Sequence, residues 1–150
     1  MIPQRPPRGF TLVELVMVIV IVGILAVTVM PKMLDLTMWR LKAFGDEFVA
    51  QTLSMERLAL AQRRAILATI APTGITFTYV SGGATIASVP CPTTITSCIS
   101  EATRTVTFNT GNSGSAATST GSAITVTVAS GSYSQAYKIE TETGLIYPSP

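Results

Sequence analysis

The chain has 150 residues, enough for about one domain with a modest core. Hydrophobic residues make up 47% and charged residues only 12%, whereas about a quarter is usual for a soluble domain. The formal net charge of +2 comes entirely from Arg5 and Arg8, since the rest of the chain is balanced. After Ala71 the only basic residues are Arg104 and Lys138. This distal part lacks the basic patch of a nucleic-acid surface, so no nucleic-acid partner is expected.

A basic leader, residues 1–9, precedes a long apolar run. The run, Phe10–Met30, has 21 residues, and as a helix it would be about 32 Å long, which is the thickness of a bilayer core. This length and the flanking charges favour a membrane-spanning helix over a buried strand. A secretory signal peptide is the alternative, but the run is longer than usual for one and no clean small-residue cleavage site follows it. We therefore expect residues 10–31 to stay in the mature protein as a transmembrane helix.

Basic residues lie on both sides of the apolar run, so charge alone does not fix its orientation. A leader this short usually stays in the cytoplasm while the large C-terminal part is exported. The expected topology is therefore a single pass through a membrane, with the N-terminus cytoplasmic and the C-terminal part exported.

Residues 32–70 are predicted to continue as an amphipathic helix. Apolar residues with helical spacing form one stripe that predicts a core face: Leu41, Phe44, Phe48, Met55, Leu58, Ala59, Ile66 and Ile70. A weaker second ridge comprises Leu53, Leu60 and Leu67. This ridge either belongs to a broad core face or packs on neighbouring helices.

From residue 71 the pattern changes to a period of two, rich in Thr, Val, Ile and Tyr, which predicts strands. The expected strands are 75–80, 84–89, 104–108, 123–128, 134–139 and 144–147. Ser81-Gly82-Gly83 is typical of a hairpin turn, and residues 109–122 of a small-polar loop or flap. The predicted class is α+β, with a long N-terminal helix packed on a C-terminal antiparallel sheet. Residues 71–150 would form a β-rich globular domain.

The only two cysteines, Cys91 and Cys98, lie seven positions apart, and the chain has no histidine. A metal site would need further ligands that the distal chain does not supply. A disulfide is therefore favoured, and it implies an oxidising compartment. The alternative is a pair of unbonded small apolar side chains.

Catalytic chemistry has little support in the sequence. Without histidine, a serine or cysteine nucleophile lacks its usual base. Glu140 and Glu142 have the spacing of two that places side chains on one face of a strand. A solvent-exposed strand face explains them better than a glycosidase pair. No enzyme activity, catalytic residue, metal or cofactor is expected.

The stretch RGFTLVELVMVIVIVGILAVTVMP resembles the N-terminus of type IV pilins and type II secretion pseudopilins. The resemblance covers about residues 8–31. It implies that a prepilin peptidase cuts after Gly9 and N-methylates Phe10. It also implies that Glu14 and Phe10 act in subunit assembly and that Pro31 kinks the helix. The resemblance further implies a place in the bacterial inner membrane, with residues 71–150 as a periplasmic domain, and then in a pilus or pseudopilus.

Residues 56–68 and 74–79 also resemble the GspH/FimT-type branch of the family, which includes mannose-sensitive-haemagglutinin minor pilins. It implies a structural filament subunit, a minor pilin of a pilus used in adhesion or motility. Its partners would be other pilin or pseudopilin subunits, the prepilin peptidase and the inner-membrane assembly platform. The alternatives are a minor pseudopilin of a type II secretion system, a DNA-uptake pilin and a membrane-anchored binding module.

Glu14 has three interpretations. Thr11-x-x-Glu14 has the spacing of a capping box, and an acid there also favours the positive end of the helix dipole. A carboxylate near lipid headgroups is a second possibility. The family resemblance implies a third, in which cleavage frees an ammonium group on Phe10 that pairs with Glu14 of the same or an adjacent chain. This assembly role is favoured, since acids within membranes tend to be functional.

Two helix-breaking residues also have alternative interpretations. Pro31 either marks the end of the span or produces the kink that the family resemblance implies. Gly23 is either a close-packing point between helices or a tolerated membrane glycine.

Overall fold

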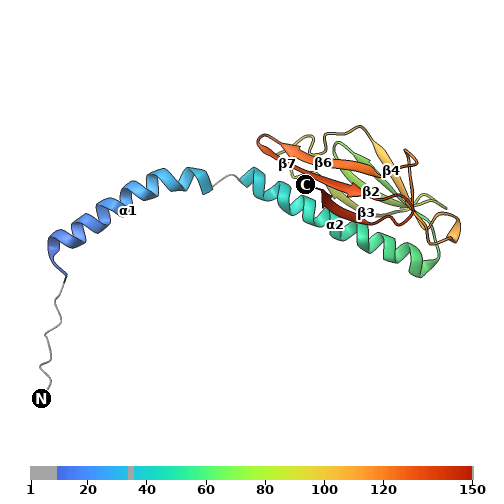
Figure 1. Ribbon diagram of the computed structural model, residues 1–150, viewed down its shortest axis with the longest axis horizontal. Helices are drawn as coiled ribbons and strands as arrows, with labels where there is room; N and C mark the ends of the chain where they lie inside the picture. Colours follow the sequence, from blue (N-terminus) through green and yellow to red (C-terminus); the bar gives the residue numbers. More distant parts are fainter. Residues whose placement is uncertain (1–9, 34–35, 150) are drawn as a thin grey trace, which may run out of the picture. The chain divides into compact units, whose positions relative to one another are not determined.

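The computed structural model describes residues 10–33 and 36–149, apart from the side chains of residues 28–33. The chain divides into two compact units, Met1–Asp35 and Leu36–Pro150. Helix α1, Leu12–Met33, belongs to the first unit, and all other elements belong to the second (Figure 1). The predicted leader, residues 1–9, lies outside the described residues.

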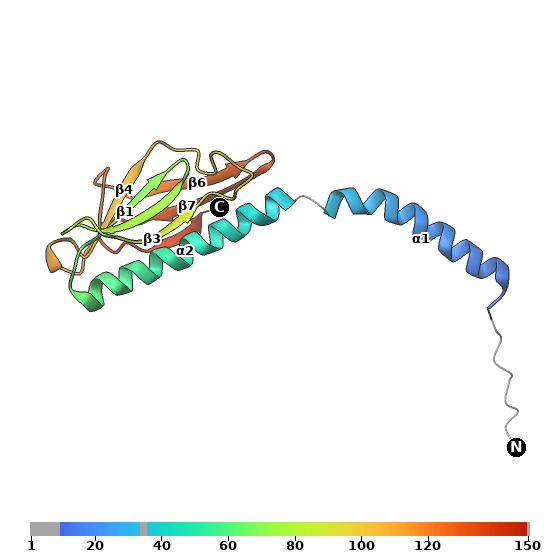
Figure 2. The same cartoon turned by 180° about the vertical axis from the view of Figure 1, so that it is seen from behind.

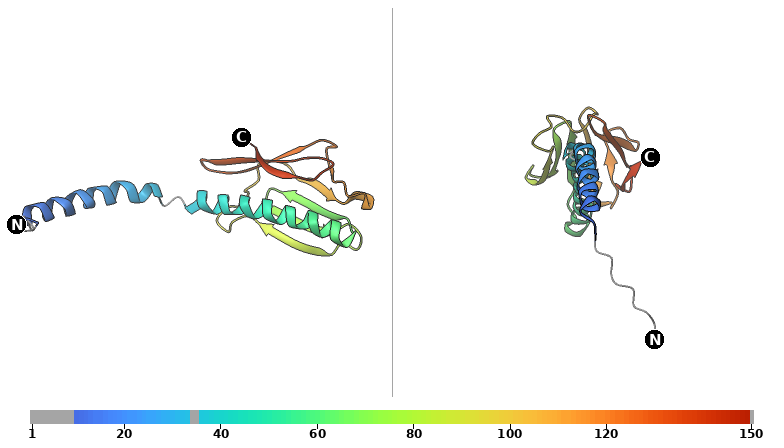
Figure 3. Two further views of the ribbon diagram at one scale, coloured as in Figure 1. Left: turned by 60° about the horizontal axis from the view of Figure 1, so that its bottom comes forward. Right: turned by 90° about the vertical axis from the view of Figure 1, so that its left-hand side faces the viewer.

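Helix α2, Leu36–Gln62, carries the buried face of the second unit. Within α2, five residues of the predicted stripe are buried: Leu41, Phe44, Phe48, Met55 and Ala59. The helix packs against strands of two sheets (Figures 2 and 3). The approach is close because position 45 is a glycine: a Cβ there would lie 2.1 Å from the Tyr137 hydroxyl oxygen. The α+β class predicted from the sequence is confirmed.

The predicted helix over 32–70 is wrong beyond Gln62. Arg63 has a φ of 51°, in the left-handed region, and ends the helix. The Arg64 amide donates to the Ala59 carbonyl at 3.1 Å and the Arg63 amide to the Leu60 carbonyl at 3.2 Å, the pair of bonds that defines a Schellman motif. Strand β1, Ile66–Ala71, follows directly. Leu67 therefore lies on a strand, and the second helical ridge does not extend to it.

Arg63 occupies a position where glycine is favoured, so Arg63→Gly should stabilise the fold. The left-handed conformation costs a side-chain-bearing residue about 1–2 kcal/mol, partly offset by the greater entropy of unfolded glycine. We expect a net gain of about 0.5–1 kcal/mol in urea unfolding of the full chain in detergent. Arg64→Gly is the control and should be destabilising, since the Arg64 guanidinium lies 3.9 Å from the centroid of the Tyr79 ring. A destabilised Arg63→Gly variant would contradict this assignment.

The strands form two antiparallel sheets. The five-stranded sheet has the order β3-β2-β1-β4-β5 and the three-stranded sheet the order β6-β7-β8. Their remaining members are β2 Gly74–Tyr79, β3 Thr85–Pro90, β4 Arg104–Phe108, β5 Ala117–Thr118, β6 Ile124–Ser130, β7 Tyr133–Ile139 and β8 Ile146–Ser149. The six predicted strands correspond to β2, β3, β4, β6, β7 and β8 with small shifts of their ends. The predicted loop over 109–122 contains the short strand β5 and a 3₁₀ turn, Thr110–Asn112.

Cys91 and Cys98 form a disulfide whose loop closes over the β1–β2 turn. The Cys98 amide donates to the Pro72 carbonyl and the Cys91 amide to the Thr73 carbonyl, each at 3.0 Å. The chain then reaches the second sheet, where the Ala129 amide of β6 donates to the Cys98 carbonyl at 3.0 Å. The disulfide loop therefore ties both sheets together at one end of the domain.

Candidate assembly site at the start of helix α1

Helix α1 exposes apolar side chains on every side. Between Phe10 and Val27 the large apolar side chains are all exposed, with fractions from 45% at Val16 to 79% at Phe10. A soluble monomer rarely exposes a continuous apolar surface of this kind. A helix that is hydrophobic all round is typical of a buried or membrane environment. This surface therefore requires an apolar partner outside the folded monomer.

Thr11 caps the start of α1. Its hydroxyl oxygen accepts a hydrogen bond from the Glu14 amide at 3.3 Å, and its carbonyl accepts one from the Leu15 amide at 3.1 Å. The bond to the hydroxyl satisfies an amide group that a helix start otherwise leaves free, and the bond to the carbonyl is the first regular bond of the helix. The Thr11 half of the predicted capping box is therefore present.

The Glu14 side chain is exposed one helical turn after Phe10, which is itself exposed. Glu14 lies in the first turn of α1, where the helix dipole favours a negative charge. In the uncut chain Phe10 has an amide rather than an ammonium group, so the predicted ion pair has no cation before cleavage. The structure shows an accessible acid beside the predicted cut, and the pairing itself stays a prediction. Gly9 lies outside the described residues.

The other residues predicted on this helix occupy less informative positions. Pro31 lies inside α1, which continues to Met33, and the predicted kink stays a prediction. A Cβ at Gly23 would meet no atom within 4 Å, so nothing in the chain itself requires glycine there. Among the described residues, no helix is long and apolar enough to cross a membrane. The membrane span over 10–31 therefore also stays a prediction.

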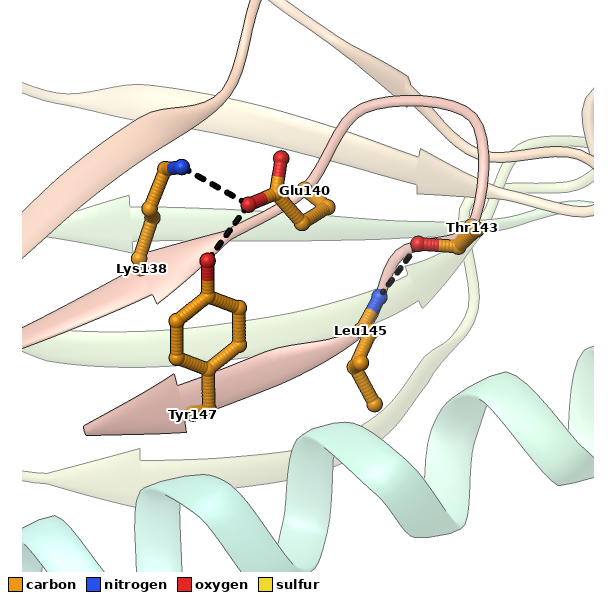
Figure 4. Close-up of polar contacts among 5 residues, drawn as sticks. All are labelled: Lys138, Glu140, Thr143, Leu145 and Tyr147. Carbon is orange, nitrogen blue, oxygen red and sulfur yellow. Dashed lines mark hydrogen bonds and ion pairs between the residues drawn. The ribbon is translucent and has the colours of Figure 1, made fainter. Parts of the chain in front are cut away.

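The acidic pair Glu140 and Glu142 is not on a shared strand face. Strand β7 ends at Ile139, and Glu142 lies in a turn with a φ of 70°. The Lys138 ammonium lies 2.8 Å from the Glu140 carboxylate, which also accepts a hydrogen bond from the Tyr147 hydroxyl at 2.5 Å (Figure 4). The bond from Lys138 lowers the pKa of Glu140 most, and the bond from Tyr147 lowers it further. The bond to Glu140 raises the pKa of Lys138. The group is a surface contact between β7 and β8.

This contact predicts a pH-dependent stability. Folding lowers the pKa of Glu140. The stability that its ionised carboxylate contributes is therefore fully present above the ordinary pKa of 4.5, and it is lost as the pH falls through the lower pKa of the folded state. Glu140→Gln should therefore be less stable than the wild type at neutral pH and equally stable in strong acid. Urea unfolding across that range measures the difference. Glu142→Gln is the control, since Glu142 forms no ion pair within the described part of the chain. A pH-independent difference for Glu140→Gln would contradict the prediction.

Residues 10–33 and 36–149 contain no group of three or more His, Cys, Asp and Glu side chains that could hold a metal ion.

One exposed residue was not singled out by the sequence patterns. Trp39, the only tryptophan, is 59% exposed on α2. Its signal in the sequence is its place between an apolar run and the basic residues Arg40 and Lys42.

Comparison with known proteins gives one match, which lies at the start of the chain. The family model for the prokaryotic N-terminal methylation motif matches residues 5–30. No curated protein and no solved structure matches the chain. The match includes Phe10 and Glu14, the exposed residues at the start of α1.

Proposed function

We propose that the chain is a minor pilin, and the match of residues 5–30 to the N-terminal methylation motif supports this assignment to the type IV pilin-like and pseudopilin subunits. In this proposal prepilin peptidase cuts after Gly9 and N-methylates Phe10. The processed chain then enters a filament through α1. One observation carries the proposal: the motif coincides with a helix whose apolar side chains are exposed all round.

The proposed assembly step uses Glu14 and the new terminus of Phe10. When apolar helices of neighbouring subunits surround Glu14, its carboxylate loses water, and an unpaired buried charge is costly. The ammonium freed by cleavage is a partner charge of the right sign, in the same chain or an adjacent one. Misplacing one subunit along its neighbour would leave both charges unpaired. The pair would therefore select the register between subunits as well as stabilise it.

The proposed location is the inner membrane before assembly and the filament after it. Residues 10–31 would hold the chain in the bilayer, with the leader in the cytoplasm and the domain in the periplasm. The disulfide between Cys91 and Cys98 supports this topology, because disulfides persist in oxidising compartments. The inner-membrane assembly platform and other pilins would be the partners.

Mass spectrometry of the N-terminus tests the proposal. The wild type recovered from its host should begin at Phe10 and carry an added methyl group. Gly9→Leu should remain uncut, because the peptidase would no longer find the small residue before the cut. Glu14→Gln is the control and should still be cut, since its substitution lies beyond the scissile bond. An intact Met1 on the wild type, or normal cutting of Gly9→Leu, would reject the assignment.

The filament that takes up the subunit is the second question. A minor pilin should appear in sheared pili, in a small ratio to the major subunit, and its deletion should reduce piliation. A minor pseudopilin of a type II secretion system is the alternative, and its deletion should instead block secretion while pili remain. Comparing both phenotypes in one deletion strain separates the two.

A further inference from the structure

A pocket of about 350 Å³ lies between α2 and the second sheet. One of its walls comes from β7, where Tyr133, Gln135 and Tyr137 lie at a spacing of two that places their side chains on one face of the strand. Pro148 of β8 pairs with Tyr137 and extends this wall. The volume is at the lower end of the range for small-molecule sites. The pocket therefore has room for one small ligand.

Lys42 and Asp46 form the rim of the pocket on α2. They are four residues apart, so they are neighbours on the helix surface, and both are exposed. Within residues 10–33 and 36–149 the only ion pair is Lys138–Glu140, so the Lys42 ammonium and the Asp46 carboxylate are not bonded to each other. No other charged residue lines the pocket. The rim therefore carries one donor and one acceptor of full charge and no net charge.

Tyr137 forms the floor of the pocket and is only 5% exposed. It packs closely on the helix, since a Cβ at Gly45 would lie 2.1 Å from its hydroxyl oxygen. The Phe48 ring meets the Tyr137 ring edge to face, with the centroids 5.8 Å apart. Burial raises the pKa of Tyr137 to about 12, and the nearby Tyr133 and Asp46 add to that rise. The Tyr137 hydroxyl therefore keeps its proton at physiological pH.

We propose that this pocket binds one neutral sugar ring of a glycan. Sugar hydroxyls both donate and accept hydrogen bonds, and the Asp46 carboxylate accepts, the Lys42 ammonium donates and tyrosine hydroxyls do either. The Gln135 amide nitrogen donates to the Ser149 carbonyl at 3.0 Å, which holds the side chain in place and leaves its oxygen as an acceptor. The half-buried Tyr133 ring offers an apolar surface to the C–H groups of a sugar.

Two other occupants fit the pocket less well. An anionic ligand would meet the Asp46 carboxylate at the rim, and like charges repel. A protein partner needs a far larger contact surface than a pocket of this volume offers. All of the residues that line the pocket belong to the second unit, Leu36–Pro150. The sugar site therefore does not depend on the proposed filament role, and the two proposals fail separately.

Titration of the isotope-labelled full chain with sugars, followed by NMR of its backbone amides, tests the site. The chain is held in dodecylphosphocholine micelles, whose headgroup contains no sugar. The probes are the methyl glycosides of glucose, galactose, mannose and N-acetylglucosamine. A ligand of about a dozen non-hydrogen atoms with ordinary binding efficiency has a dissociation constant of about 1 mM. We expect at least one glycoside to bind in that range and to shift the amides of Asp46, Tyr133 and Gln135.

Two neighbouring acids on α2 give a matched pair of variants. Asp46→Ala removes a charged acceptor from the rim and should weaken glycoside binding by about tenfold. Glu47→Ala removes an exposed acid that does not line the pocket and should bind as the wild type does. Both substitutions lie on the exposed side of a helix, where alanine is well tolerated.

Three results would overturn the sugar site. The first is the absence of saturable shifts with every glycoside at concentrations far above the expected dissociation constant. The second is unchanged binding in Asp46→Ala, which would place the ligand elsewhere on the chain. The third is tighter binding of glucuronate or inorganic phosphate than of the glycosides, which would make the ligand an anion. None of these results bears on the cleavage after Gly9 or on filament assembly.

Discussion

Replacing Glu14 with valine should leave the protein cut, methylated and membrane-bound, yet reduce its amount in filaments by about tenfold or more. Removing one partner of a buried ion pair costs roughly 3–5 kcal/mol, because the remaining charge stays unpaired. Here the remaining charge would be the Phe10 ammonium in the filament core. The readout is the ratio of subunit in sheared filaments to subunit in membranes, measured by quantitative immunoblotting.

Two further variants separate this assembly role from helix capping. Glu14→Gln keeps the length and polarity of the side chain but removes its charge, so it should be nearly as defective as Glu14→Val. Thr11→Ala removes the cap hydroxyl that the Glu14 amide contacts, at a cost of about 1 kcal/mol to the helix, and should assemble nearly normally. If Thr11→Ala is as defective as Glu14→Val while Glu14→Gln assembles normally, Glu14 acts as a cap and the ion pair is wrong.

Gly74→Ala should destabilise the domain by about 3 kcal/mol, the sum of backbone strain and overpacking. Gly74 has a φ of 140°, which L side chains rarely adopt. A Cβ there would lie 2.5 Å from the Val89 carbonyl oxygen and 2.9 Å from the Pro90 Cα. Both are backbone atoms of the neighbouring strand, so they cannot move aside without disturbing the pairing of β2 with β3. Urea unfolding of the full chain in detergent, followed by circular dichroism, measures the loss.

Gly82→Ala is the matched control for Gly74. Gly82 also has a positive φ, 95°, but a Cβ there would meet nothing within 4 Å. Its substitution carries the conformational strain alone and should cost about 1 kcal/mol. The difference between the two variants isolates the steric conflict with β3. Equal losses would show that strain alone makes Gly74 necessary.

The sheet region was largely predictable because its strands have a clear period of two and are separated by polar or glycine-rich turns. The error at Ile66–Ala71 has a definite cause. Ile66, Ala68 and Ile70 are buried on alternate positions of β1, but Ile66 and Ile70 also have the spacing of four that continues a helical stripe. Periodicity cannot separate the two patterns over so few residues. Arg63 did not indicate the end of the helix either, because glycine is the residue that usually marks such an end.

The candidate assembly site was predictable as a set of residues and not as an arrangement. Phe10 and Glu14 follow from a motif with fixed order and spacing, and both lie exposed at the start of α1. The ion pair depends on a covalent change that the uncut chain has not undergone, and on neighbours that a single chain does not contain. The exposed Trp39 was missed for another reason. A stripe of buried residues reveals the core face of a helix, whereas a single exposed aromatic residue has no period to detect.

The disulfide loop also bears on how the domain would acquire its fold after the export proposed above. With two cysteines in the whole chain, only one intramolecular pairing exists. No wrong pairing can form within the chain for thiol–disulfide exchange to rearrange. The domain therefore needs an oxidant but no disulfide isomerase. The closed loop holds the β1–β2 turn and reaches β6. A single oxidation step after export would therefore join the two sheets, and a strain lacking its periplasmic thiol oxidase should accumulate the reduced subunit.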